Sequence, residues 1–159
     1  MTDTLDSATS RRQFCIRACQ FASLSAVGGI LGASCGGGPT SPGDLGSALP
    51  TVSGSTANGA VTVNVAAGSA LATVGGAALV QSSTGMFLVA RTAQSTFVAL
   101  TATCTHQACT VTNMSSSLYV CPCHGSEYDT SGHVVRGPAT QALRQFATQF
   151  TDPTLTISV

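Results

Sequence analysis

Two short stretches decide how this chain folds and what it binds: CTHQAC at residues 104–109 and CPCHGSEYD at residues 121–129. Together they hold four of the seven cysteines and two of the three histidines in 159 residues. Two thiolates with two imidazoles form a donor set that suits either zinc or an iron–sulfur centre. Metal chemistry is therefore expected where these two stretches meet.

The spacing of the donors narrows the choice of site. Cys104 and His106 stand as C-x-H, Cys121 and His124 stand as C-x-x-H, and fourteen residues separate the two pairs. A zinc finger carries both cysteines in one half and both histidines in the other, whereas each half here carries one of each. The spacing therefore argues against a zinc finger and for two loops that face each other.

Composition excludes several classes of function. Charged residues make up only 8% of the chain, lysine is absent, and the formal net charge is zero. A nucleic-acid-binding face needs clustered basic residues, so no nucleic-acid partner is expected. Glycine, serine and threonine interrupt every apolar run, which argues against a protein with several membrane spans.

The N-terminal segment, residues 1–35, is predicted to be an export signal. Residues 10–16, SRRQFCI, resemble a twin-arginine export signal centred on Arg11 and Arg12, and an apolar run with many small residues follows at 18–34. The alternative is an exposed arginine pair ahead of a buried helix. Export through this pathway predicts a periplasmic protein or one on the outer face of the membrane.

Cys35 ends this segment and precedes a stretch rich in glycine, proline and serine. A cysteine after small residues is typical of a lipoprotein processing site, so Cys35 is the candidate lipidation site. Ordinary signal cleavage and retention of the segment as a membrane anchor are the alternatives. In each case residues 36–50 are predicted to form a flexible tether.

Residues 51–159 predict a small all-β domain, an antiparallel sandwich or barrel. Short segments rich in valine, threonine and phenylalanine alternate with turn residues, and no helical stripe appears. Both cysteine-bearing stretches are expected as loops that project from the sheets. The predicted strands are 61–65, 77–81, 86–91, 96–102, 117–120, 133–136 and 154–159.

The two cysteine-bearing stretches resemble the cluster-binding boxes of the Rieske iron–sulfur family. In that family one iron of a 2Fe-2S cluster is held by two cysteines and the other by two histidines. The resemblance implies Cys104 and Cys121 as ligands of the inner iron. It implies His106 and His124 as ligands of the outer iron, where neutral imidazoles raise the potential above that of an all-cysteine cluster.

The other two cysteines of the boxes, Cys109 and Cys123, and two hydroxyl side chains indicate a subgroup of the family. In members with the same extra cysteine pair, the residues that match Cys109 and Cys123 form a disulfide between the two loops. Hydroxyl groups that match Ser126 and Tyr128 donate hydrogen bonds to cluster or ligand sulfur in high-potential members. The resemblance therefore implies the disulfide-bearing type, similar to the Rieske subunit of quinol–cytochrome c oxidoreductase.

A third segment resembles the loop that covers the cluster. Gly137, Pro138 and Ala139 match its start, while Thr140 stands where quinol-oxidising members often carry a second proline. Outside the boxes, His133 is expected as an exposed strand residue. The acidic residues of the second stretch, Glu127 and Asp129, are expected to be solvated loop acids, since nothing pairs them for acid–base work.

Three functions follow from these interpretations. The first is an exported protein that carries one electron at a time on a Rieske 2Fe-2S cluster, with a cytochrome or an oxidoreductase subunit as its redox partner. The second is a subunit of a quinol-oxidising cytochrome bc-type complex or of an arsenite-oxidase-like enzyme. The third is a structural zinc domain. The sequence contains no catalytic pocket of its own, so any enzymatic role depends on a partner.

Overall fold

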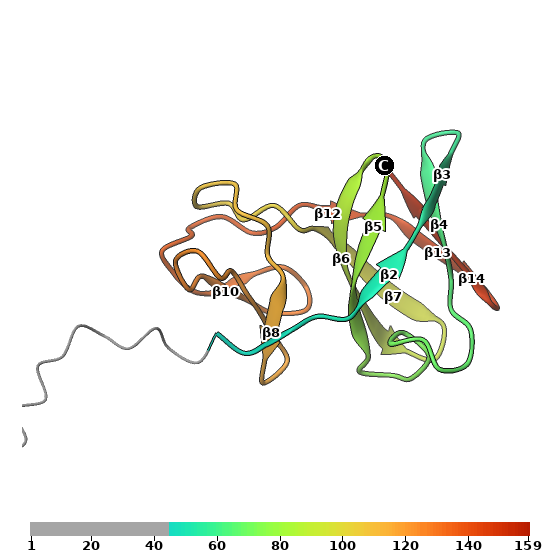
Figure 1. The fold of residues 1–159 in the computed structure, drawn as a ribbon, viewed down its shortest axis with the longest axis horizontal. Coiled ribbons are helices and arrows are strands. Elements are labelled where there is room, and N and C mark those ends of the chain that lie inside the picture. The colour runs from blue at the N-terminus through green and yellow to red at the C-terminus, as the bar shows by residue number, and fades with distance from the viewer. Residues whose placement is uncertain (1–44) are drawn as a thin grey trace, which may run out of the picture. The chain divides into compact units, whose positions relative to one another are not determined.

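The computed structural model describes residues 45–159, which lie within one compact unit, Pro39–Val159. These residues form fourteen strands and no helix, so the all-β prediction is confirmed (Figure 1). Between residues 45 and 159 there is accordingly no apolar helix that could cross a membrane. Arg11, Arg12, Cys35 and most of the predicted tether lie outside the described residues.

The strands form three sheets. In the order of neighbouring strands, the loop sheet is β1-β8-β9-β10-β11, the central sheet is β12-β7-β6-β5-β2, and the outer sheet is β13-β14-β4-β3. Neighbours are antiparallel except for β2 and β5, which are parallel. The strand bounds are β1 Ser47–Ala48, β2 Thr51–Ser53, β3 Ser55–Ala57, β4 Ala60–Asn64, β5 Ala77–Ser82, β6 Gly85–Ala93, β7 Thr96–Thr101, β8 Asn113–Ser115, β9 Leu118–Val120, β10 Glu127–Tyr128, β11 Val134–Arg136, β12 Gln145–Phe146, β13 Thr148–Thr151 and β14 Thr154–Ser158.

The central sheet is buried on both faces, and it divides the interior into two cores. Along β6, Leu88 points to the loop sheet while Phe87 and Val89 point to the outer sheet, because successive side chains of a strand face opposite ways. The loop core comprises Leu49, Ala77, Leu79, Leu88, Ala90, Leu100, Ala102, Cys104, Val111, Tyr119, Cys121, Tyr128, Ala139 and Leu143. The base core comprises Val61, Val63, Val65, Leu71, Ala78, Val80, Phe87, Val89, Phe97, Ala99, Leu155 and Ile157.

The predicted strands correspond to β4, β5, β6, β7, β9, β11 and β14, with ends that differ by up to two residues. In β4 the buried residues Val61 and Val63 alternate with exposed ones, as the period-two pattern predicts. The runs in β5 and β6 are instead continuously apolar because both faces of the central sheet are covered. Ser82 pairs with Gly85 across the predicted hairpin turn.

The last residues of the predicted tether are docked on the domain. Ser47 and Ala48 pair with Met114 and Asn113 at the edge of the loop sheet, and Leu49 is buried in the loop core. The amide side chain of Asn113 also donates a hydrogen bond to the carbonyl of Leu45 (3.1 Å). Residues 45–50 therefore belong to the folded domain, in contrast to the expected flexible segment.

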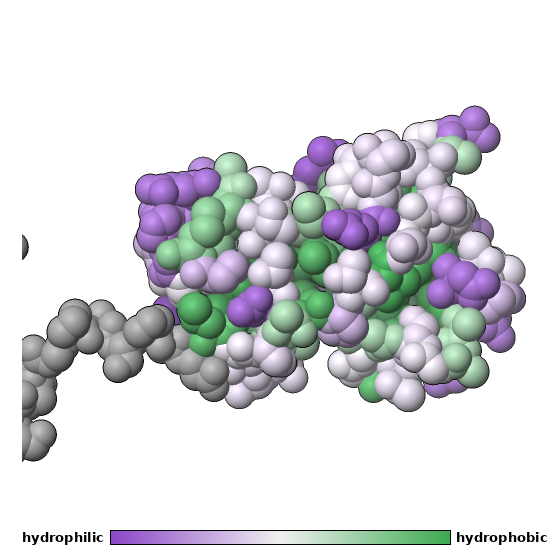
Figure 2. Space-filling model, viewed as in Figure 1, coloured by the Kyte–Doolittle hydropathy of each residue, from purple (hydrophilic) through white to green (hydrophobic). Residues whose placement is uncertain are grey.

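Within residues 45–159, four large apolar side chains are exposed: Val74, Met86, Val135 and Val159. Met86 and Val159 line one surface hollow together with Phe87 and Phe146. Figure 2 shows apolar areas broken up by pale and hydrophilic residues on the visible face. Small exposed apolar areas of this kind are normal for a folded domain.

Candidate metal centre

Two loops at one end of the molecule carry the cysteines singled out in the sequence (Figure 1). The first cysteine loop, residues 104–109, follows β7, and the second, residues 121–126, connects β9 to β10. A disulfide between Cys109 and Cys123 joins the two loops, which is the pairing that the resemblance implied. The remaining cysteines of the loops, Cys104 and Cys121, are free thiols.

The two loops share one backbone conformation. In each loop, the carbonyl oxygen of the first cysteine accepts a hydrogen bond from the N–H of the residue four positions later (2.9 Å). The N–H of the same cysteine donates a hydrogen bond to the carbonyl of the residue five positions later (2.8 Å). The fourth residue after the cysteine has a positive φ in both: +56° at Ala108 and +70° at Gly125. This turn presents Cys104 and Cys121 in matching ways from two different elements.

The histidines of the two loops lie against each other. The ring centroids of His106 and His124 are 4.9 Å apart, and the rings are perpendicular. His124 is exposed and His106 is half-buried, yet Nδ1 of His106 is buried and has no hydrogen-bond partner. A buried polar nitrogen without a partner is costly in a folded protein, so this atom fits a bond to a metal ion.

The two free thiols are more deeply buried than the histidines, with exposed fractions of 2% for Cys104 and 1% for Cys121. Burial opposes ionisation of Cys104, but hydrogen bonds from Tyr128, the His106 backbone and neighbouring side chains outweigh it and lower the pKa of Cys104. Burial, together with the nearby Cys104, raises the pKa of Cys121. Two neighbouring thiolates repel each other, and a metal centre bound between them would supply a compensating positive charge.

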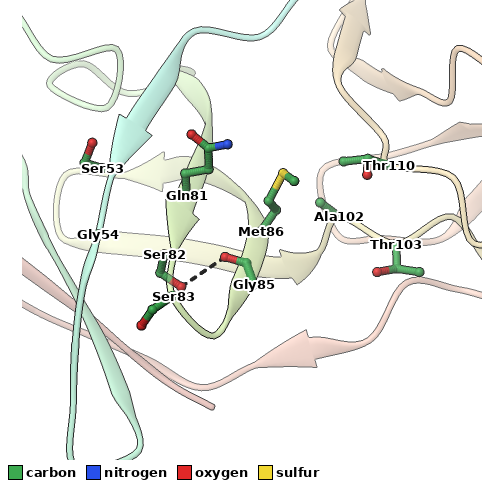
Figure 3. Close-up of a pocket in the computed structure, with 10 residues that line it drawn as sticks. All are labelled: Ser53, Gly54, Gln81, Ser82, Ser83, Gly85, Met86, Ala102, Thr103 and Thr110. Carbon is green, nitrogen blue, oxygen red and sulfur yellow. Dashed lines mark hydrogen bonds between the residues drawn. The ribbon is translucent and has the colours of Figure 1, made fainter.

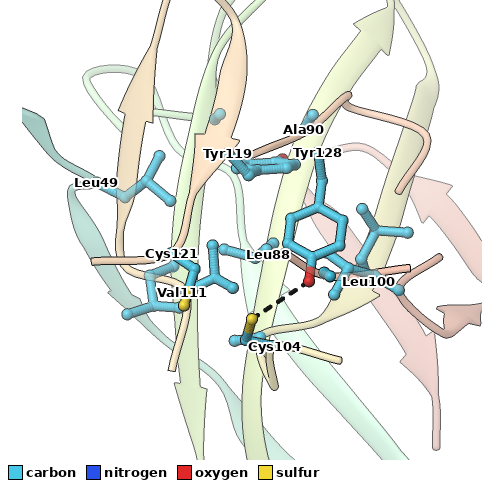
Figure 4. Packing of buried hydrophobic residues seen from close by; sticks show 14 residues of the cluster. Leu49, Leu88, Ala90, Leu100, Cys104, Val111, Tyr119, Cys121 and Tyr128 are labelled. Atoms are coloured by element: carbon cyan, nitrogen blue, oxygen red, sulfur yellow. Dashed lines mark hydrogen bonds between the residues drawn. The ribbon is translucent and has the colours of Figure 1, made fainter. Parts of the chain in front are cut away.

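Tyr128, on β10, contacts the first cysteine loop at two residues. Its hydroxyl oxygen is 3.3 Å from Sγ of Cys104 and 3.0 Å from Oγ1 of Thr105. Figure 4 draws the contact with Cys104 as a dashed line. The N–H of Thr105 also donates to it (3.2 Å). Burial raises the pKa of Tyr128, so this hydroxyl keeps its proton and can donate to sulfur.

The predicted cover segment packs over both loops. The N–H of Ala139 donates a hydrogen bond to Oγ of Ser126 (3.0 Å), and both residues are buried. Two residues further on, the carbonyl of Gln141 accepts a hydrogen bond from Oγ1 of Thr105 (2.7 Å). One contact holds the segment to each cysteine loop, so residues 137–141 form a lid over the thiols.

A second group of sulfur atoms lies close together but does not form a metal site. The sulfurs of Cys109, Cys121 and Cys123 all lie within 4.8 Å of one another. Two of them are joined in the disulfide and therefore offer no thiolate, which is the form that binds metal. The disulfide instead packs beside the free thiol of Cys121.

The comparison with known proteins agrees with this geometry. The family model of the Rieske 2Fe-2S domain matches residues 62–147, more than half of the chain and both cysteine loops. The chain belongs to the Rieske 2Fe-2S domain family. Members of this family carry an iron–sulfur cluster, and the donor set of the two loops fits it.

Two relatives are iron-sulfur subunits of cytochrome b6-f complexes. This Rieske domain chain is 36% identical over 106 residues to the cytochrome b6-f complex iron-sulfur subunit of Synechococcus elongatus, covering 60% of this chain and 59% of that one. It is 56% identical over 45 residues to the same subunit of Trichodesmium erythraeum, covering 28% and 25%. The match thus spans about three fifths of the length of the Synechococcus elongatus subunit.

Among solved structures, the cyanobacterial plasma membrane Rieske protein of Synechocystis PCC 6803 is 32% identical. The match covers 53% of this chain and 87% of that one, with a TM-score of 0.47.

Several features of this Rieske domain differ from the expectations. Glu127 and Asp129 were expected to be solvated loop acids, but their side chains are only 20% and 40% exposed and each has a partner. Arg136 donates to Glu127 (2.9 Å), and Asp129 accepts hydrogen bonds from backbone N–H groups and lies 3.4 Å from the ring of His133. His133 itself is exposed, as expected.

Sequence reasoning also missed Thr105 and the carbonyl of Gln141. The only feature of the sequence that could have indicated a role for Thr105 is its position between two candidate metal ligands, Cys104 and His106. The contact joins a side chain to a backbone atom 36 residues away, and no spacing rule reaches that far.

A separate groove of the Rieske domain lies away from the histidines. It measures about 600 Å³, and hydroxyl and amide side chains such as Ser53, Gln81 and Thr103 line it (Figure 3). Its lining contains no charged or metal-binding side chain. The groove therefore offers neither an acid–base pair nor a metal site.

Proposed function

We propose that this protein transfers single electrons through a Rieske 2Fe-2S cluster held between the two cysteine loops. Cys104 and Cys121 are the ligands of the inner iron, and His106 and His124 are the ligands of the outer iron. The observation that carries the proposal is the buried Nδ1 of His106, which has no hydrogen-bond partner within residues 45–159. The ring of His106 lies against that of His124, and each of the two loops also carries a free buried thiol. When bound, the cluster supplies a one-electron couple at a raised potential.

The surrounding residues have distinct roles in this proposal. Tyr128 donates a hydrogen bond toward Cys104, which favours the more negative, reduced state. Ser126 acts in the same sense from the second loop and is held by Ala139. The disulfide keeps the loops together, and the exposed ring of His124 lets a redox partner approach the outer iron.

An EPR-monitored redox titration of protein matured with iron and sulfide tests this function. We expect a rhombic reduced-state signal with a reversible one-electron midpoint inside the Rieske range of about −150 to +300 mV. Iron and acid-labile sulfide should be present in equal amounts. Zinc without sulfide, and no EPR signal, would contradict the proposal and support the structural zinc domain.

A role within a cytochrome bc-type complex is the second candidate. Its support is the similarity to iron-sulfur subunits of cytochrome b6-f complexes. Quinol as the electron source follows from this candidate alone, whereas a cytochrome partner is compatible with both candidates. Co-purification of the tagged protein with a cytochrome b from its native membrane would support it, whereas isolation as a free protein with an active couple would favour the independent carrier.

We also propose export by the twin-arginine pathway, with residues 1–35 as the signal segment and 36–44 as the remaining tether. The support is the sequence of the segment, with Arg11 and Arg12, and the cysteine at position 35. Replacing both arginines by lysine should leave the protein in the cytoplasm. Mass spectrometry of the exported protein then distinguishes a lipidated Cys35 from ordinary cleavage and from retention of the signal.

A further inference from the structure

The hydroxyl of Tyr128 has more acceptors than hydrogens. It carries one proton, and three polar groups lie within hydrogen-bond distance: Sγ of Cys104, the N–H of Thr105 and Oγ1 of Thr105. The N–H of Thr105 can only donate, so it occupies a lone pair of the tyrosine oxygen. The single proton is left for either the sulfur or Oγ1 of Thr105.

The direction of the bond between the two hydroxyls is fixed by a third group. Oγ1 of Thr105 is 2.7 Å from the carbonyl oxygen of Gln141, which has no hydrogen to give. Thr105 therefore donates its only hydroxyl proton to Gln141. Toward Tyr128 it has only lone pairs, so it is an acceptor that competes with the sulfur of Cys104.

Ser126 provides an internal contrast. Its hydroxyl oxygen accepts the N–H of Ala139 (3.0 Å), so its own proton is not committed to that contact. A hydrogen bond from this hydroxyl also lowers the pKa of Cys104. Within residues 45–159, the contacts of Ser126 include no second hydroxyl that would compete with the sulfur for its proton. The two hydroxyls that face the thiols thus differ: the proton of Ser126 is available to sulfur, and that of Tyr128 is shared.

We propose that Thr105 is a positioning residue that draws part of the Tyr128 hydrogen bond away from the Cys104 sulfur and thereby lowers the midpoint potential of the centre. The proposal rests on the proposed function, because it concerns how the sulfur ligand is stabilised. A hydrogen bond to a ligand sulfur favours the reduced state, so an acceptor that competes for the proton weakens this effect. The hydroxyl of Thr105 has a second task, since its proton anchors the lid at Gln141.

The test is a double-mutant cycle read as midpoint potentials at one fixed pH. Thr105→Val keeps the shape of the side chain and removes the competing acceptor, so the potential should rise above that of the wild type. Thr105→Ser keeps the hydroxyl and should restore the wild-type potential. Tyr128→Phe removes the proton and should lower the potential, and in that background Thr105→Val should have no further effect.

Each other outcome bears on the proposal. A fall in potential on Thr105→Val would overturn it, because Thr105 would then support the bond to sulfur. An equal shift with and without Tyr128 would overturn it too, since the effect would arise from the lid or from solvent. If neither Thr105→Val nor Thr105→Ala takes up iron while Thr105→Ser does, the hydroxyl serves assembly, and the proposal is wrong.

The proposed function fails in a different way. In that case the wild-type protein itself gives no reduced-state EPR signal and contains no acid-labile sulfide. The cycle therefore separates an error about Thr105 from an error about the cluster.

Discussion

The two halves of the domain are stabilised by different means. The base, formed by the central and outer sheets, has strands of up to nine residues around an apolar core, with one register shift between Arg91 and Ala93 of β6. The loop half, formed by the loop sheet and the cysteine loops, has strands of two or three residues and depends on a disulfide, buried thiols and side-chain hydrogen bonds. Longer paired strands stabilise the base, whereas the loop half adds specific cross-links and leaves a polar atom for a ligand.

The largest expected effect is a loss of bound iron from the loop half that leaves the base folded. Cys104→Ser replaces a thiol of lowered pKa by a hydroxyl that does not ionise, so bound iron should fall about tenfold or more. Backbone amides of the central and outer sheets should keep their protection from hydrogen exchange. His133→Gln, at an exposed site, is the control and should retain the iron. Loss of protection throughout the base would contradict the separation of the two halves.

The next effect breaks the base. Ile157 is fully buried in the base core, and Ile157→Ala should lower the free energy of unfolding by about 2 to 5 kcal/mol. Val135→Ala removes an exposed apolar side chain and should change it by less than about 0.5 kcal/mol. Urea unfolding measures both variants. A small loss at Ile157 would mean that the base does not depend on its apolar packing.

The difference between the halves also explains what the sequence could predict. Five of the nine strands of the base, β4, β5, β6, β7 and β14, have a period of two or an apolar run, so local pattern identified them. The pattern missed β2, β3, β12 and β13 of the base and β1, β8 and β10 of the loop half, because each of these strands has four residues or fewer and is too short to show a period. The cysteine and histidine motifs identified the loops. The bond from Thr105 to Gln141 depends on how the lid folds back, which no local pattern encodes.

A smaller effect concerns the link between the loops. Replacing Cys109 and Cys123 by alanine removes a cross-link that spans 14 residues. Chain-entropy arguments predict a loss of about 3 kcal/mol in the free energy of unfolding. Hydrogen exchange should locate the lost protection in the loop half. If protection in the base fell by the same amount, the halves would unfold together.

The smallest expected change in stability comes from exchanging alanine and glycine at equivalent positions of the two cysteine loops. Ala108 and Gly125 occupy the same position in the two cysteine loops, and both have positive φ. Ala108→Gly should therefore stabilise the protein by about 0.5 to 1 kcal/mol. Gly125→Ala should destabilise it by about 1 kcal/mol from backbone conformation alone, because open space surrounds the added Cβ. Thermal unfolding measures both, and shifts of the same sign would refute the equivalence of the loops.

The docking of β1 has a mechanical consequence. Tension applied through the N-terminus reaches the loop sheet first, at the pairing of Ser47 and Ala48 with β8, and only then the β2–β5 pair of the central sheet. A pull would detach β1 and expose Leu49 before the base was disturbed. Force on the chain would thus act on the half of the molecule that holds the histidines, while the base would remain an undeformed support.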